Sequence, residues 1–379
     1  MVPSAPGDLR AVTIAAPVVA NDEGGMERVM ARVASGLLER GYAVTVIAYV
    51  CKLDRHPALR VALVPGPRRP AALSFPWFAL AASVAIRRHG RGRLMTQGAI
   101  VPLRADVACV HFCSHGFYAQ RREPRRRRDT LPYRVNEWLD RSMTLAAERW
   151  VYGRDRIEAA VAVSPGLADE LRRLFPPLAP SVHVIPNGVD LEEFRPDAAA
   201  RTQVREGLGV GEAPLAVFVG GDWARKGLGL ALEAIAAAPP WQLLVVGEGD
   251  QARFSAQAEE LGLRGRVHFV GRRRSPAPYL AAGDAFVLPS AYEPFGLVML
   301  EAGASGLPLV VSRTDGSDEL VREGENGFVI ERAPVAFAAA LIALAEDPVR
   351  RLRMGERARA LAAPYAWSRV VDAYAEVLA

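Results

Sequence analysis

The stretch "EPFGLVMLE", residues 293–301, decides how this chain is organised. It lies within "DAFVLPSAYEPFGLVMLEAGASGLPLVVS", residues 284–312, where "DAFVLPS" is typical of a buried strand and "GLVMLEAGA" of a buried helix. We therefore predict a strand-to-helix turn, with Glu293 before the helix and Glu301 about two turns into it. The first N–H groups of such a helix, from Gly296 onward, have no partner inside the helix and make a ready site for phosphate.

The two carboxylates at the ends of this stretch suit the two ends of an extended ligand. A carboxylate accepts hydrogen bonds from adjacent hydroxyls of a sugar or ribose, which an amide or a lysine does less well. The alternative is a carboxylate that caps the helix followed by one that is exposed on it. The apolar residues between Glu293 and Glu301 favour the ligand-binding interpretation.

On both sides of this stretch, apolar strands alternate with helices. Strands that are apolar throughout are typical of parallel sheets covered on both faces. The alternation stops at the proline-rich segment 175–196, "FPPLAPSVHVIPNGVDLEEFRP", which we interpret as a linker, and then restarts. This pattern predicts an α/β protein with two doubly wound, Rossmann-like domains, whose ligands bind beyond the carboxyl ends of the strands, in the cleft between the domains.

The expected boundaries follow from the alternation. We predict an N-terminal domain at 1–185, a C-terminal domain at 186–365, and a final amphipathic helix at 366–379 that packs back on the N-terminal domain. A chain of 379 residues exceeds the usual size of one core, which agrees with two domains.

Composition indicates a folded protein of the cytoplasm. The N-terminus lacks a basic region followed by an apolar run, so we expect no signal peptide. Three cysteines do not form a disulfide framework and fit a reducing compartment. The longest apolar stretch, 71–86, is shorter than the ~20 residues of a membrane span. It is interpreted as a buried helix, with contact to a membrane surface as the alternative.

Charge is distributed unevenly along the chain. Residues 1–185 carry 27 lysines and arginines against 16 aspartates and glutamates, whereas the remainder carries 20 against 26. A basic first half predicts an anionic acceptor or an acidic membrane surface as a partner. The arginine run at 121–128 is either part of such a surface or a solvated loop. No alternation of aromatic and basic residues indicates nucleic acid.

A second strand-to-helix turn, "FVGGDWARKGL", places Arg225 and Lys226 at a helix entrance. Lys226 is one of two lysines among 47 basic residues, and a compact ammonium suits a diphosphate oxygen in a narrow space. Cations at a helix N-terminus are unfavourable, which indicates an anion beside them. Near the start of the chain, Gly24 and Gly25 precede the first helix and either allow close approach of a ligand or supply a turn.

Two further patterns resemble known sites only superficially. "GEGDQA" at 247–252 lacks the third glycine and the acidic residue of a dinucleotide fingerprint, so a nicotinamide enzyme is not expected. "CVHFCSH" at 109–115 would place its cysteines and histidines on one face of a strand, but their span of ~20 Å is too long for one zinc ion. His111, at the exit of this strand, is a candidate for hydrogen bonding to a ligand hydroxyl or a satisfied core histidine. No aspartate pair suits a metal-bound sugar nucleotide, so we expect no metal.

Together these segments resemble the retaining glycosyltransferases of family 4, which have the GT-B architecture. The similar motifs run in family order over nearly the whole chain, and the Glu-x₇-Glu pattern of residues 293–301 is the most specific of them. The remaining motifs are "EGG", "VHF", "VSPGLADEL", "VIPNGVDLEEFRP", "FVGGDWARKGL", "LLVVGEGD", "VHFVGRR" and "NGFVI".

The resemblance implies roles for individual residues. It implies that Glu301 holds the ribose hydroxyls of a nucleotide-diphosphate sugar, Glu293 meets the donor sugar, and Lys226 contacts the diphosphate. His111 would act beside the reacting sugar, so the implied catalytic set is His111, Lys226 and Glu293. The family usually has an arginine where this chain has Gly221, and Arg225 is the substitute. The implied substrate-binding residues are Gly24, Gly25, Asn187, Gly221, Arg225, Val270, Gly271, Phe295, Gly296, Leu297 and Glu301.

The resemblance also implies the reaction. A sugar would pass with retained anomeric configuration to a cell-surface glycan, a glycolipid or a natural product, without a cofactor. The diphosphate oxygen would help to remove the acceptor's proton, so stabilising the leaving group is the largest task of the site. Two alternatives remain: a sugar-nucleotide epimerase of the same fold, and a non-catalytic nucleotide-sugar-binding protein.

Overall fold

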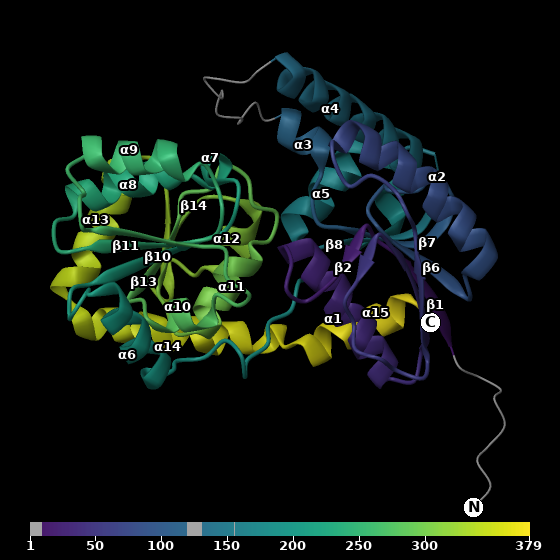
Figure 1. The fold of residues 1–379 in the computed structure, drawn as a ribbon. Helices are drawn as coiled ribbons and strands as arrows, with labels where there is room; N and C mark the ends of the chain where they lie inside the picture. The colour runs from purple at the N-terminus through teal and green to yellow at the C-terminus, as the bar shows by residue number, and fades with distance from the viewer. Residues whose placement is uncertain (1–9, 120–130, 155) are drawn as a thin grey trace, which may run out of the picture. The chain divides into compact units, whose positions relative to one another are not determined.

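The computed structural model describes residues 10–119, 131–154 and 156–379, so the arginine run at 121–128 lies outside the described residues. The chain divides into two compact units, one built from the chain up to Asn187 together with Trp367–Ala379, and the other from Gly188–Ala366. Each unit is a parallel sheet with helices on both faces (Figure 1). Each is described separately below.

The first unit contains a seven-stranded parallel sheet in the order β5-β3-β1-β6-β7-β8-β9. Helices α1 and α15 lie on one face of this sheet, and α2, α3, α4 and α5 lie on the other (Figure 1). Its strands are β1 (Ala11–Ala15), β3 (Ala43–Ala48), β5 (Leu59–Leu63), β6 (Arg93–Gln97), β7 (Ala105–Val110), β8 (Ile157–Ala162) and β9 (Val182–Val184), with a separate pair β2 (Val18–Val19) and β4 (Val50–Cys51). Its helices are α1 (Gly25–Glu39), α2 (Ala71–His89), α3 (Ser114–Ala119), α4 (Leu131–Tyr152), α5 (Pro165–Leu174), the 3₁₀ helix η1 (Pro176–Ser181) and α15 (Trp367–Val377).

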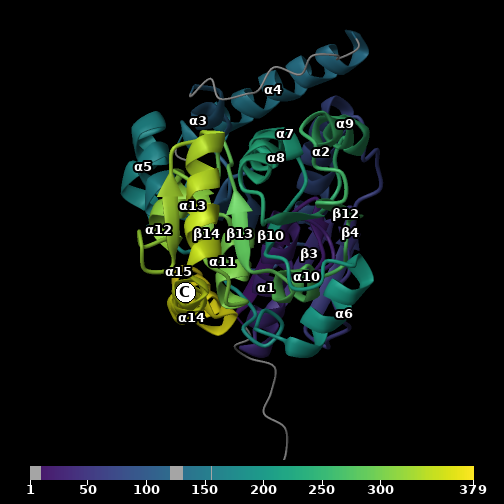
Figure 2. The same cartoon turned by 90° about the vertical axis from the view of Figure 1, so that its left-hand side faces the viewer.

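The second unit contains a six-stranded parallel sheet in the order β12-β11-β10-β13-β14-β15. Helices α8, α9 and α13 lie on one face, and α6, α10, α11 and α14 on the other (Figures 1 and 2). Its strands are β10 (Leu215–Val219), β11 (Gln242–Val246), β12 (Val267–Gly271), β13 (Ala285–Leu288), β14 (Leu309–Ser312) and β15 (Gly327–Ile330). Its helices are α6 (Ala198–Leu208), α7 (Trp223–Lys226), α8 (Leu228–Ala237), α9 (Gln251–Glu260), α10 (Ala277–Ala281), α11 (Leu297–Ala304), α12 (Asp315–Leu320), α13 (Pro334–Glu346), α14 (Pro348–Ala362) and the 3₁₀ helix η2 (Ala363–Tyr365).

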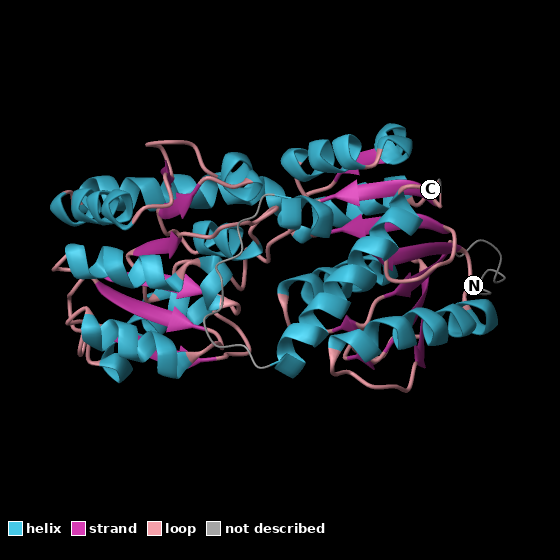
Figure 3. Cartoon of the chain, turned by 90° about the horizontal axis from the view of Figure 1, so that it is seen from above, coloured by secondary structure: helices cyan, strands magenta, loops and turns pink. Residues whose placement is uncertain are grey.

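Both sheets are fully parallel, as Figure 3 shows from above. The core strands are buried along their length, for example all of β10 and β13. This is the pattern that apolar strands with helices on both faces require. The α/β, Rossmann-like fold class predicted from the sequence is confirmed.

Helix α15 packs against α1 in the first unit. Arg40, at the end of α1, donates from Nε to Asp372 Oδ1 at 2.7 Å and from Nη2 to the carbonyl of Ser368. Gly41 follows with φ of +80°, the left-handed conformation that ends a helix. The C-terminal helix is therefore part of the core of the first unit.

Three local predictions differ from the structure. The first part of the expected linker is η1 and β9, which forms the edge of the first sheet, where prolines are tolerated. The strand β7 ends at Val110 and helix α3 begins at Ser114, so "CVHFCSH" is not one strand with a single histidine and cysteine face. Helix α11 begins at Leu297, so Glu301 lies one turn into it instead of two.

The apolar stretch 71–86 does form a helix, but the prediction that it is buried is wrong. Within α2 only Phe78, Ala82 and Ser83 are buried. The apolar composition of this stretch indicates that it packs against an apolar surface. It does not show whether the rest of the chain is large enough to cover all sides of the helix. Among the described residues, no helix is both long and apolar enough to cross a membrane.

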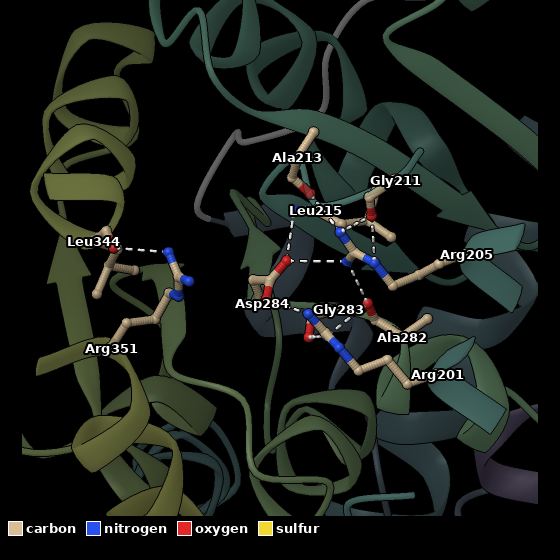
Figure 4. A network of polar contacts seen from close by, with 10 residues as sticks. All are labelled: Arg201, Arg205, Gly211, Ala213, Leu215, Ala282, Gly283, Asp284, Leu344 and Arg351. Carbon is tan, nitrogen blue, oxygen red and sulfur yellow. Dashed lines mark hydrogen bonds and ion pairs between the residues drawn. The ribbon is translucent and has the colours of Figure 1, made fainter. Parts of the chain in front are cut away.

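The amino-terminal edge of the second sheet is held by a network of polar contacts (Figure 4). The side chains of Arg201 and Arg205 in α6 donate to the two carboxylate oxygens of Asp284, at 2.8 and 3.2 Å. Asp284 also accepts the N–H of Leu215 at the start of β10. This network attaches α6 at the amino-terminal ends of β10 and β13, away from their carboxyl ends.

Candidate active site

The second sheet changes direction between β10 and β13. The chain runs outward from β10 through β11 to β12 and then returns to place β13 on the other side of β10. Ligands of doubly wound sheets bind beyond the carboxyl ends of the strands at this switch point, because the connecting loops diverge there. The segments that follow these two strands contain Lys226 and Glu293, respectively.

The side chains of Lys226 and Glu293 meet at this point. Lys226 Nζ lies 2.9 Å from Glu293 Oε2, and both side chains are largely buried. The residues are 67 positions apart in the sequence, so the sheet order alone brings them together. The structure thus joins two residues that the sequence singled out on separate grounds.

Arg225 reaches the same carboxylate. Its guanidinium lies 3.6 Å from Glu293 Oε2, donates to the carbonyl of Tyr292 at 2.6 Å, and pairs with Asp222 at 3.1 Å. Asp222 has a φ of +44°, a left-handed conformation that is uncommon for a residue with a side chain. The loop after β10 is therefore shaped to turn two cations toward one carboxylate.

The charge state of Glu293 follows from these neighbours. Burial raises the pKa of its carboxyl, but the positive charges of Lys226 and Arg225 and their hydrogen bonds outweigh burial, and the pKa is lowered below its usual value. Glu293 is thus an anion at neutral pH and balances the two cations. An entering phosphate would find positive groups already held in place.

Glycines at the strand ends keep this region narrow. A Cβ on Gly220 would lie 2.7 Å from the Lys226 side chain, and one on Gly247 would lie 2.1 Å from the Gly220 carbonyl. Trp223 is buried and donates from Nε1 to the same carbonyl at 2.9 Å. The backbone after β10 therefore packs against Lys226 in a way that only glycine permits.

The stretch 293–301 lies next to the loop that contains Lys226. Gly296 has φ of +80° and is the N-cap of α11, and a Cβ there would clash with Met299. Phe295 and Leu297 are buried on either side of it, and Glu301 is buried on the first turn of the helix. The free N–H groups of this helix start thus lie in the same loop as Glu293.

The remaining predicted residues of the second unit lie at the carboxyl ends of neighbouring strands. Gly221 follows β10, and a Cβ there would meet only the Glu248 carbonyl, at 3.6 Å. Val270 and Gly271 end β12, where Gly271 has φ of +72° and open space around its Cα. All three lie on the same sheet edge as the Lys226–Glu293 pair.

The first sheet has its own switch point between β1 and β6. A pocket of about 160 Å³ lies next to it, at the carboxyl ends of β6 and β7. It is lined by Met26 of α1, by Gln97 at the end of β6 and Gly98 after it, by His111 after β7, and by side chains of α2 and α4. In both units, therefore, the candidate site lies near a switch point, beyond the carboxyl ends of the strands.

His111 lines this pocket with both ring nitrogens buried. Neither nitrogen forms a well-shaped hydrogen bond with another described residue. Burial lowers the pKa of the ring to about 4, and the nearby Cys109 backbone offsets only part of that shift. The ring is therefore neutral at physiological pH and can bind a hydroxyl group as donor and acceptor.

Gln97 is a residue that the sequence reasoning missed. Its Oε1 is buried without a hydrogen-bond partner among the described residues and lines the same pocket as His111. β6 pairs with β7 in the register Gln97 to Cys109, which places the two strand exits side by side. A polar side chain at the carboxyl end of "RLMTQGA" was the available signal. Two buried polar groups in one pocket thus have hydrogen-bonding capacity for a ligand or a water molecule.

The sequence reasoning also missed the support behind this pocket. Glu148 of α4 is buried and accepts the N–H groups of Ser114 and His115, at 2.8 and 3.0 Å. Its carboxylate also lies 2.7 Å from His115 Nδ1. Glu148 thereby fixes the start of α3, three residues after His111.

The other predicted residues of the first unit lie at its periphery. Gly24 and Gly25 are exposed at the N-terminus of α1, and neither has a positive φ, so no unusual turn explains them. A Cβ on Gly24 would lie 2.5 Å from the Glu27 carboxylate. Asn187 is buried, and its Oδ1 has no partner among the described residues. In the part of the chain described, no group of three or more histidine, cysteine or acidic side chains is arranged to hold a metal ion.

Comparison with known proteins agrees with this arrangement. The profile of Glycosyltransferase Family 4 matches residues 23–193, and that of Glycosyl transferases group 1 matches residues 201–361. The chain belongs to glycosyltransferase family 4. The two profiles meet near the point where the structure divides into two units, so each describes one of them.

Family 4 relatives resemble the chain over part of their length. The D-inositol 3-phosphate glycosyltransferase of Xylanimonas cellulosilytica is 35% identical over 247 residues, which are 60% of this chain and 59% of that protein. Among solved structures, WaaG, a glycosyltransferase involved in lipopolysaccharide biosynthesis, has a TM-score of 0.82 at 21% identity and covers 97% of this chain and 99% of its own. HepE of Anabaena, in complex with UDP and glucose, has a TM-score of 0.77 at 20% identity and covers 97% and 99%. These structural likenesses show that the chain has the GT-B fold.

Proposed function

We propose that this chain is a retaining glycosyltransferase that transfers a sugar from a nucleoside diphosphate sugar to an acceptor hydroxyl. The observation that carries the proposal is the Lys226–Glu293 pair, with Arg225 beside it, at the switch point of the second sheet. The family, and a fold neighbour that holds UDP and glucose, support the choice of donor.

In the proposed reaction the bond between the anomeric carbon and the diphosphate oxygen breaks, and a bond from the acceptor oxygen forms on the same face. The acceptor's proton passes to the departing phosphate. Lys226, Arg225 and the N–H groups at the start of α11 stabilise the negative charge that develops on the diphosphate. Preorganised charges of this kind act before the bond breaks and need no reorganisation during the reaction.

The two carboxylates of the stretch 293–301 bind hydroxyls in this proposal. Glu301 accepts from the ribose of the donor, and Glu293 orients Lys226 and accepts from the donor sugar. Glu301 is buried and the side chain of Glu293 is 14% exposed, so hydrogen bonds that the donor makes with them are largely shielded from water.

The pocket in the first unit binds a hydroxyl-bearing substrate group through His111 and Gln97. Among the residues that the structure describes, its lining includes one carboxylate, Glu148, and no lysine or arginine. The part of the acceptor that enters it is therefore not anionic. If the acceptor is anionic, as the charge of the first half predicts, its charge lies outside this pocket.

Isothermal titration calorimetry tests the donor site. Titration with UDP-, GDP-, ADP- and dTDP-sugars identifies the base, and Glu301→Ala is expected to weaken binding of that donor by roughly 10–100-fold, because buried charge-assisted hydrogen bonds are worth ~1.5–3 kcal/mol. Lys226→Met is expected to reduce turnover by about 100-fold or more. Lys52→Met is the matched control, because it removes the only other lysine, which is exposed and pairs with Asp22 and Glu23.

Two results would contradict the proposal. One is unchanged donor binding in Glu301→Ala, and the other is a mild effect of Lys226→Met, similar to that of the control. An epimerised donor formed without any acceptor would instead assign the chain to the epimerases of this fold.

A further inference from the structure

Helix α2 carries an exposed apolar stripe. Its members are Leu73 (59% exposed), Trp77 (48%), Leu80 (65%) and Val84 (38%), which are spaced four, three and four residues apart and lie along one side of the helix. Arg88 continues the same spacing at the end of the helix. A stripe of this kind is usually covered by a partner, because exposing it to water is unfavourable.

The opposite side of α2 is already occupied. Phe78 and Ala82 are buried in a core cluster with Ile47 of β3 and Val64, which follows β5. This contact orients the helix and determines which side remains exposed. The stripe is therefore held rigidly on the surface of the first unit.

A groove of about 760 Å³ lies between the stripe and the edge strand β5. β5 pairs with β3 on one side only, and its Val61 and Leu63 are 45% and 61% exposed. Trp77 forms part of the wall and donates from Nε1 to the carbonyl of Pro65 at 2.7 Å. Apolar side chains thus line both sides of the groove.

The charges around this groove are all of one sign. Residues 55–105, which include β5, α2 and β6, contain nine arginines and no aspartate or glutamate. Arg60, Arg88 and Arg91 line the groove together with His89, and these three arginines form no ion pair with a carboxylate of the described residues. An apolar strip bordered by arginines without counter-ions suits a surface that is apolar inside and anionic at its boundary.

We propose that the outer side of α2 and the edge strand β5 form a docking surface for an anionic lipid bilayer. Leu73, Trp77 and Leu80 would enter the boundary between headgroups and acyl chains, while the arginines contact lipid phosphates. Tryptophan is favoured at this depth, and because the N–H of Trp77 already donates to the Pro65 carbonyl, its apolar ring can enter without leaving that group unpaired. A second copy of the chain is disfavoured as the occupant, since it would place like charges against one another.

The docking surface is adjacent to the pocket of the first unit. Phe75, two residues before Trp77 in α2, lines the pocket with His111 and Gln97, while Trp77 lines the groove. One helix therefore borders both features. The docking surface does not depend on the proposed function, but it would bring a membrane-bound acceptor close to that pocket.

Vesicle sedimentation tests the docking surface. The full-length protein is expected to sediment with phosphatidylglycerol–phosphatidylcholine vesicles at low salt, to sediment less at physiological salt, and to remain in solution with pure phosphatidylcholine. Changing Arg60, Arg88 and Arg91 together to Gln is expected to weaken binding by roughly 100-fold, since each basic residue near an acidic membrane contributes about a factor of five.

Two variants at equally exposed leucines test whether the protein binds vesicles through this surface or through another. Leu80→Glu should reduce binding by at least tenfold, because it places a carboxylate in the apolar strip. Leu352→Glu is the control, since Leu352 is 66% exposed on α14 of the second unit and Leu80 is 65% exposed on α2. Circular dichroism confirms that both variants are folded.

The proposal is overturned if the wild-type protein does not bind acidic vesicles at low salt. It is overturned equally if Leu80→Glu and Leu352→Glu bind as the wild type does, which would place the contact elsewhere. Binding of soluble polyanions that depends on the arginines, without vesicle binding, would assign the surface to another partner. A failed calorimetric test of the donor site would leave these outcomes unchanged.

Discussion

The side chains of Lys226 and Glu293 depend on each other. Each would be unfavourable when buried alone, and their ion pair makes burial of both tolerable. A phosphate group of a ligand can replace part of the interaction between the Glu293 carboxylate and Lys226. The ion pair with Glu293 therefore holds Lys226 in place before a ligand arrives.

His111 provides a prediction at the same scale. Its pKa is lowered to about 4, so the folded protein binds no proton there until the pH falls far below the usual histidine value of 6.5. The unfolded chain takes up that proton between pH 6.5 and 4, and stability is lost over this window as the pH falls. NMR of the six histidines, with His111→Gln used for assignment, should show an imidazole signal that does not titrate between pH 8 and 5.

A midpoint near 6.5 for that signal would contradict the buried, neutral ring. His111→Gln should also remove part of the acid sensitivity of unfolding, because Gln has no proton to take up. An unchanged dependence of stability on pH in this variant would lead to the same conclusion.

The helices, strands and turns that depend on nearby residues in the sequence were predictable. Apolar runs predicted the strands, and glycines at the ends of β10 and before α11 predicted the turns where Lys226 and Glu293 lie. The neighbouring positions of β10 and β13 were not predictable from these rules, because strand order depends on long-range packing. The exposed side of α2 was not predictable either, since an apolar helix does not show which surface covers it. Gln97 became visible only when β6 and β7 were placed side by side.

The network at the amino-terminal edge of the second sheet gives a prediction at the scale of elements (Figure 4). Arg205 is buried and donates to Asp284 and to the carbonyls of Gly211, Ala213 and Ala282. Arg205→Ala should lower the free energy of unfolding of the second unit by about 3–5 kcal/mol, because it leaves buried acceptors without donors. Urea denaturation followed by tryptophan fluorescence measures this loss.

Arg201→Ala is the control for that experiment. Arg201 binds the same carboxylate, but 35% of its side chain is exposed, so its removal should cost about 1 kcal/mol or less. Equal losses in the two variants would show that burial does not determine the strength of this network.

At the scale of the whole molecule, the two units repeat one design with different chemistry. Each is a parallel sheet with a switch point, and each places its candidate residues beyond the carboxyl ends of the strands next to it. The second unit places cations and carboxylates there, whereas the first places the uncharged His111 and Gln97 beside the carboxylate of Glu148. This division matches a reaction in which one substrate carries a diphosphate and the other presents a hydroxyl.

The charge of the chain follows the same division. The basic first half is explained neither by its pocket, whose described lining contains no arginine or lysine, nor by ion pairs of the arginines that line the groove beside α2, which pair with no carboxylate of the described residues. We attribute part of it to the proposed docking surface. Charge patterning in the sequence thus predicted an anionic partner, and the structure indicates which surface can contact it.

A crystal structure of the protein soaked with the nucleoside diphosphate sugar chosen by calorimetry tests the central claim most directly. We predict electron density for the diphosphate beyond the carboxyl ends of β10 and β13, within hydrogen-bond distance of Lys226 Nζ, with the ribose at Glu301. Density for the nucleotide at any other part of the second unit, with Lys226 bound only to Glu293, would contradict the account.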